Sequence, residues 1–241
     1  MNTQSNTYTF VYAAIMVVVV AALLSLAATS LKPLQDKNVE VEKKQSILSS
    51  VGIGLDAAEQ KDKNTYIEQL YEKHIIETYI VNSKGDKIKG DAFNVDMKKE
   101  MAKSLEKRKL PVFVGQQSDG SKNLILPLRG KGLWGPIWGY VALQDDYSTI
   151  VGANFDHKSE TPGLGAEINT DNFENQFVGK QLFDSNNNFV SVAVVKGQDT
   201  RNDAHAVDGI SGGTITSNGV DAMLEESLGS YVTHFKELQK Q

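Results

Sequence analysis

The chain has 241 residues, of which 40% are hydrophobic and 23% are charged, a balance that is ordinary for a globular protein and sufficient for one large domain or two small ones. Its formal net charge of -5 and its lack of a basic cluster interleaved with aromatic residues argue against a nucleic-acid partner. The absence of cysteine excludes disulfides, iron–sulfur ligation and a thiolate nucleophile.

The amino-terminal segment 10–28 has no charged residue, and its length is close to what a helix needs to cross a bilayer core of roughly 30 Å. We expect a tail and transmembrane anchor at 1–35 and a globular domain at 36–241. A cleaved signal peptide is the alternative, but residues 1–9 contain no Lys or Arg. The lysines that follow the span favour a cytoplasmic domain by the positive-inside rule, although this rule weakens for long translocated domains.

Helical spacing of apolar residues predicts helices at 39–53 and 65–81, and 97–109 is typical of a charged surface helix. The pattern then changes, and three strands of an antiparallel unit are predicted at 110–115, 123–128 and 137–144. A polar stretch at 145–165, a β-branched strand at 189–197 and a last helix at 220–238 follow. The expected fold is a mixed α/β (α+β) domain with an antiparallel or mixed sheet and flanking helices.

The loop 208–219, DGISGGTITSNG, precedes the last helix and is rich in glycine and hydroxyl groups. Such a loop at a helix N-terminus suits a phosphate, although a simple turn capped by Ser217 or Asn218 is the commoner explanation for a loop of this kind. It also contains a G-x-S-x-G pattern around Ser211, with Asp221 and His234 as the remaining members of a hydrolase triad. The residues before it are polar rather than a buried strand, which argues against a hydrolase.

This loop resembles the flavinylation sequence of the FMN-binding domain family. The family includes the C subunit of sodium-translocating NADH:quinone oxidoreductases and the G subunit of Rnf complexes. The matching positions are Asp208, Gly209, Ser211, Gly212 and Thr214, and Gly213 replaces the usual alanine. The resemblance implies FMN joined through its phosphate to Thr214, with Thr216 as the second choice. It also makes Ser211, Gly212, Gly213 and Ile215 expected cofactor contacts.

Three further segments carry the resemblance along most of the chain. Segment 159–165, SETPGLG, resembles a family segment that lies against the flavin, and GLWG at 132–135 resembles its aromatic loop. Segment 191–197, SVAVVKG, contains Lys196, which matches a family lysine near the cofactor. Taken without the family, these residues are a Pro-Gly turn, a core tryptophan and a solvent-facing lysine. The resemblance implies cofactor contacts from Glu160, Thr161, Gly163, Leu164, Leu133, Trp134 and Lys196.

The resemblance implies that this protein carries covalent FMN and relays electrons as one subunit of a multi-subunit membrane complex. It implies two kinds of partner. The first is the other subunits of the membrane complex, including another flavin-carrying subunit that receives the electrons, and the second is a flavin transferase that uses FAD and a divalent metal. It also implies a bacterial inner membrane protein with a periplasmic domain. The sequence has no G-x-G-x-x-G motif between a predicted strand and a predicted helix, so it shows no NADH site. The spacing of the histidines predicts no structural metal. An Rnf G subunit and a membrane-anchored domain with a reversibly bound ligand remain alternatives.

Overall fold

The computed structural model describes residues 5–197 and 199–240, and the chain divides into two compact units, Met1–Lys43 and Lys44–Gln241. Helix α1 (Asn6–Ser49) begins in the first unit and ends in the second. Among the described residues, α1 is the helix that is long and apolar enough to cross a membrane, with a mean hydropathy of 2.7 in its most apolar window. The apolar side chains of that window are exposed, as those of a lipid-facing helix must be.

The second unit is built on a six-stranded antiparallel sheet with the strand order β2-β1-β3-β4-β5-β6. The strands are β1 (Ile75–Val81), β2 (Lys87–Ile88), β3 (Leu110–Gln116), β4 (Lys122–Lys131), β5 (Pro136–Leu143) and β6 (Ile150–His157). Two short strands, β7 (Ala193–Val195) and β8 (Ala206–Asp208), pair in parallel as a separate sheet.

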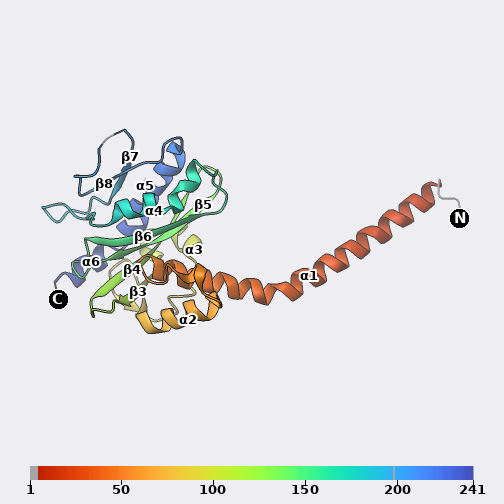
Figure 1. The fold of residues 1–241 in the computed structure, drawn as a ribbon, viewed down its shortest axis with the longest axis horizontal. Helices are drawn as coiled ribbons and strands as arrows, with labels where there is room; N and C mark the ends of the chain where they lie inside the picture. The colour runs from red at the N-terminus through yellow and green to blue at the C-terminus, as the bar shows by residue number, and fades with distance from the viewer. Residues whose placement is uncertain (1–4, 198, 241) are drawn as a thin grey trace. The chain divides into compact units, whose positions relative to one another are not determined.

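One face of the large sheet packs against helix α5 (Thr214–Gly229), which also lies beside the β7–β8 pair (Figure 1). Alternate residues of β4 point to this face, as the two-residue period of a strand requires. Leu124, Leu126 and Leu128 join the apolar side of α5, including Val220 and Leu224, in one buried core. This packing holds the start of α5 next to the end of β4.

The opposite face of the sheet carries Phe113 of β3 and Tyr140 of β5, whose rings meet edge to face. The turn after α1 lies on this side, because a Cβ on Gly152 would come within 2.5 Å of the Ser50 carbonyl oxygen. Helix α2 (Lys63–His74) contacts β1. Both faces of the sheet are therefore covered within the second unit.

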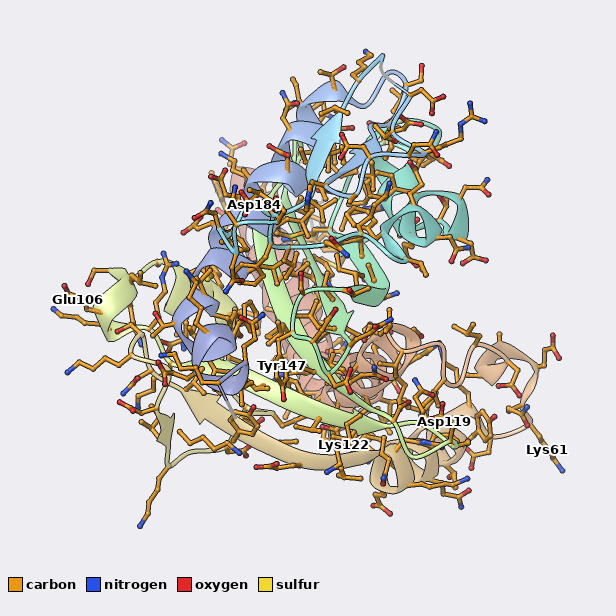
Figure 2. All side chains as sticks on the ribbon, turned by 90° about the vertical axis from the view of Figure 1, so that its left-hand side faces the viewer. Lys61, Glu106, Asp119, Lys122, Tyr147 and Asp184 are labelled. Atoms are coloured by element: carbon orange, nitrogen blue, oxygen red, sulfur yellow. The ribbon has the colours of Figure 1, made fainter. Side chains whose placement is uncertain are left out.

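The remaining helical segments are short. They are α3 (Met97–Met101), α4 (Asp171–Glu174), α6 (Val232–Leu238) and the 3-10 turns η1 (Ala57–Glu59), η2 (Leu105–Lys107), η3 (Gly165–Asn169) and η4 (Asn175–Phe177). Charged side chains such as Lys61 and Glu106 point outward from the domain (Figure 2). Such exposure is typical of lysine and glutamate.

The predicted helix at 65–81 is wrong beyond His74, because Ile75–Val81 forms strand β1. Five of these seven residues are β-branched, which restricts χ1 in a helix and suits a pleated sheet. The helix predicted at 97–109 is also interrupted, since α3 ends at Met101 and only the short turn η2 follows.

The chain from residue 150 onward differs from the sequence prediction at several points. Strand β6 is absent from the prediction, because its residues fall in the polar stretch 145–165. The strand predicted at 189–197 is limited to β7. The last helix begins at Thr214 rather than Val220, and it is broken at Ser230 and Tyr231 into α5 and α6.

Candidate functional site

A pocket of about 220 Å³ lies where three segments far apart in the sequence meet. The β4–β5 connection, the segment between β6 and η3, and the first turn of α5 each contribute residues. The lining consists of Leu133, Trp134, Glu160, Thr161, Leu164, Gly165, Gly212, Gly213, Thr214, Ile215 and Thr216. The pocket is smaller than a typical cavity that encloses a whole ligand, so a larger ligand would extend beyond it.

The start of α5 forms the polar side of this pocket. Gly213 is the N-cap residue, no side chain caps the helix, and its first turn contains no acidic residue. Gly212 has a φ of +76°, and a Cβ there would lie 2.6 Å from Leu164 Cδ2. The positive φ favours glycine at this position, and a larger residue would also have to displace the end of the Leu164 side chain. An uncapped helix N-terminus with close backbone access is suited to an anion.

The two threonines of the first turn have opposite environments. Thr216 is 1% exposed, and its hydroxyl donates a hydrogen bond of 2.5 Å to Glu160 Oε2. Thr214 is exposed and lines the pocket. Thr214 is therefore the threonine whose oxygen an external phosphate donor can reach.

Lys196 follows strand β7 and reaches the same threonine. Its Nζ donates a hydrogen bond of 2.9 Å to Thr214 Oγ1. An ammonium group at this position favours negative charge on or beside the threonine oxygen. A phosphate attached at Thr214 would thus meet both the helix amides and a lysine.

The apolar side of the pocket is formed by four large side chains that are unusually exposed for their type. Trp134 is 65% exposed and Ile215 is 58% exposed, and Leu133 and Leu164 are also exposed. All four line the same pocket. A cluster of exposed apolar groups at a pocket marks a ligand or partner surface, and a planar aromatic ring would cover these groups.

The structure brings most of the predicted cofactor contacts together. Ser211 and Gly163 do not line the pocket, and Lys196 reaches it through Thr214. Gly165 lines the pocket and is not among the predicted contacts. Its role is steric, because a Cβ there would collide with Thr216 Oγ1. The sequence carries no local signal for that proximity, since the two residues are 51 positions apart.

The residues of the rejected hydrolase triad are engaged elsewhere. Asp221 Oδ1 accepts a hydrogen bond from the Val194 amide at 2.8 Å. His234 is buried, and its ring nitrogens lie 3.0 Å from the Tyr79 hydroxyl and 3.1 Å from the Gly85 carbonyl oxygen. Neither residue is hydrogen-bonded to Ser211 in the described structure. This arrangement does not activate a serine nucleophile.

The pocket thus combines a helix N-terminus without a side-chain cap, an exposed threonine and an apolar rim. The FMN-binding domain model matches residues 132–229, which include every segment of this pocket. The chain thus contains an FMN-binding domain.

Similar proteins identify the family more narrowly. The C subunit of the Na(+)-translocating NADH-quinone reductase from Vibrio vulnificus is 31% identical over 88% of this chain and 86% of its own length. The protein of the same name from Haemophilus ducreyi is 30% identical over 98% of this chain and 96% of its own. The crystal structure of the C subunit from Parabacteroides distasonis matches with a TM-score of 0.74 over 85% of this chain and 96% of that chain. The two sequences are 43% identical. The chain belongs to the C-subunit family of Na(+)-translocating NADH-quinone reductases.

Proposed function

We propose that this protein carries FMN joined by a phosphoester bond to Thr214 and relays electrons within a membrane Na(+)-translocating NADH:quinone oxidoreductase. One observation carries the proposal: the exposed Thr214 hydroxyl lies in the pocket, at the uncapped start of α5, and 2.9 Å from Lys196 Nζ. The names of the similar proteins support this complex over an Rnf-type complex.

Different parts of the pocket would hold different parts of FMN. The first-turn amides of α5 and Lys196 would bind the phosphate, and the apolar side chains of Leu133, Trp134, Leu164 and Ile215 would cover the ring. Bound FMN supplies electron transfer in single steps or in pairs. The protein's own residues bind the flavin, orient it and exclude water from part of its ring.

The attachment requires a second protein, because a threonine hydroxyl is not ionised near neutral pH and does not attack a phosphate unaided. A flavin transferase with FAD and a divalent metal would provide the activation. In this transfer the Thr214 hydroxyl would lose its proton and its oxygen would bond to the FMN phosphorus of FAD, with cleavage of the pyrophosphate and release of AMP. Lys196 would then neutralise part of the phosphodiester charge.

Helix α1 has the length and composition of a membrane-spanning segment. We propose that it anchors the protein in the bacterial inner membrane beside other subunits, with the flavin domain on the periplasmic side. Electrons would then pass to another flavin-carrying subunit as NADH oxidation drives sodium export.

Intact mass spectrometry of the denatured full chain, expressed with a flavin transferase in the same compartment, tests the attachment. We expect an added mass of one FMN less one water in the wild type and in Ser211→Ala, and no added mass in Thr214→Val. An unmodified wild type, from a host shown to modify another substrate, would overturn the proposal. An added mass on Thr214→Val would place the bond at another residue.

A further inference from the structure

One buried carboxylate touches every segment that forms the pocket. Glu160 is 4% exposed and lies between β6 and η3. Its Oε2 accepts the hydrogen bond from the Thr216 hydroxyl in the first turn of α5, and its Oε1 accepts a hydrogen bond of 2.8 Å from the Trp134 amide. Glu160 therefore joins the apolar wall of the pocket to the helix that carries Thr214.

Two glycines leave the space that this carboxylate occupies. A Cβ on Gly132 would lie 2.6 Å from Glu160 Oε1, and a Cβ on Gly165 would lie 2.6 Å from Glu160 Oε2. Real Cβ atoms do not approach other atoms this closely, so any larger residue at either position would displace the carboxylate. The surrounding backbone is thus shaped around the carboxylate of Glu160.

Glu160 carries a negative charge in this environment. Burial raises the pKa of its carboxyl, but hydrogen bonds from the Thr216 hydroxyl and from the amides of Trp134, Leu133 and Gly135 outweigh burial. The pKa of Glu160 therefore lies below its ordinary value. No salt bridge to Glu160 is found in the part of the chain that the structure describes, and its two carboxylate oxygens accept the hydrogen bonds from the Trp134 amide and the Thr216 hydroxyl.

We propose that Glu160 is a positioning residue for the flavin. It sets the distance between the Leu133–Trp134 wall and the first turn of α5, and it places one fixed negative charge in the pocket lining. This inference rests on the proposed function. Since reduction adds negative charge to a flavin, the carboxylate lowers the midpoint potential of the bound cofactor.

Two nearly isosteric variants separate the charge of Glu160 from its role as a link. Glu160→Gln removes the charge, and Thr216→Val removes one donor while the charge remains. Glu167→Gln is the matched control, because Glu167 lies in the adjacent turn, accepts a hydrogen bond from Gly163, and does not line the pocket. Each full-length protein is flavinylated and checked by intact mass, and the flavin midpoint potential is then measured at mildly alkaline pH.

We expect the potential to rise in Glu160→Gln, to fall in Thr216→Val, and to stay at the wild-type value in Glu167→Gln. The fall in Thr216→Val follows because the carboxylate loses a donor that disperses its charge. We also expect the visible circular dichroism of the flavin to change in Glu160→Gln, because a glutamine amide cannot accept both hydrogen bonds with the same oxygens.

Equal potentials in Glu160→Gln and the wild type would overturn the inference. So would shifts of the same sign in Glu160→Gln and Thr216→Val, since general loosening of the pocket gives no opposite effects. If Glu160→Gln does not fold or accept flavin, Thr216→Val decides alone: a lower potential supports the charge role, and an unchanged or higher potential rejects it. Failure of the proposed function is seen earlier and separately, as the absence of flavin from the wild type.

Discussion

Thr214 and Thr216 show how helix geometry separates two neighbouring hydroxyls. Residues two apart in an α-helix point in directions about 200° apart, because each residue turns the helix by about 100°. Both threonines line the pocket, but since α5 packs on the sheet, the side chain of Thr216 is buried against Glu160 and that of Thr214 is exposed. The sequence leaves both threonines as attachment points. The position of α5 favours Thr214.

Lys196 is expected to accelerate flavin attachment at Thr214. Lys196→Met removes a cation beside Thr214 Oγ1 that would stabilise the negative charge developing there during attachment, and hydrogen bonds to charged groups contribute about 1.5–3 kcal/mol. We therefore expect flavinylation by a purified transferase to slow by about ten- to a hundredfold. Lys158→Met is the control, because Lys158 is an exposed lysine that does not line the pocket. Equal rates for Lys196→Met and the wild type would contradict the role of Lys196.

Helix α5 carries the candidate site because it can approach the end of β4 closely. A Cβ on Gly219 would collide with the Lys131 carbonyl oxygen, so glycine alone fits between the helix and the strand. Helical spacing from Val220 onward predicts a buried face but not the distance to the strand. That distance depends on how the helix docks on the sheet.

Gly219→Ala is expected to destabilise the domain by about 1–3 kcal/mol, because the added methyl group must push the helix from the strand. Gly229→Ala, in the last turn of the same helix, meets its nearest atom at 3.5 Å. We expect it to stabilise by up to about 1 kcal/mol, the helix-propensity gain of alanine over glycine. Denaturant unfolding of the detergent-solubilised full chain measures both changes. Similar effects of the two variants would show that the close contact has no energetic importance.

Strands β1 and β6 were not predicted from the local sequence pattern. The residues of β1 continue the apolar spacing of α2, and seven residues are too few to separate a helix from a strand by period alone. Strand β6 includes polar positions such as Asn154 and Asp156, and it is a strand because β5 pairs with it along its length. Tertiary hydrogen bonding decided both segments.

His234 joins the end of the chain to an early strand within the second unit. The residue lies in α6, and its ring contacts Tyr79 of β1 and the carbonyl oxygen of Gly85 in the following turn. Burial lowers the pKa of His234, and the nearby Lys87 charge lowers it further, while the hydrogen bond to Gly85 opposes the shift. The histidine is therefore neutral in the folded protein near neutral pH.

The contribution of His234 to the free energy of unfolding is expected to decrease as the pH falls below about 6.5, the ordinary pKa of histidine. Below this pH the unfolded chain binds a proton at His234 that the folded chain does not, so stability is lost by at most about 1.4 kcal/mol per pH unit. His234→Gln should remove this slope. Burial raises the pKa of Glu174 to about 7, which gives the opposite slope in both proteins and cancels in their difference.

Denaturant unfolding of the wild type and of His234→Gln over the same pH range checks this expectation. The difference between their free energies should change between neutral pH and pH values below about 6.5. A constant difference would show that His234 keeps its ordinary pKa in the folded protein. It would also show that the link to Tyr79 and Gly85 does not depend on the protonation of His234.

Local properties of the sequence were sufficient for several conclusions. A long uncharged apolar run indicates the membrane helix, alternating patterns indicate β3, β4 and β5, and the loop at 208–219 with segments 132–135 and 159–165 indicates the flavin-binding family. These features depend on neighbouring residues, whose spacing a sequence shows directly. The buried link from Glu160 to Thr216, the room left by Gly165 and the outward direction of Thr214 depend on contacts between distant segments. Such contacts exist only after the sheet and α5 have packed, because their distances are set by the core that holds them together.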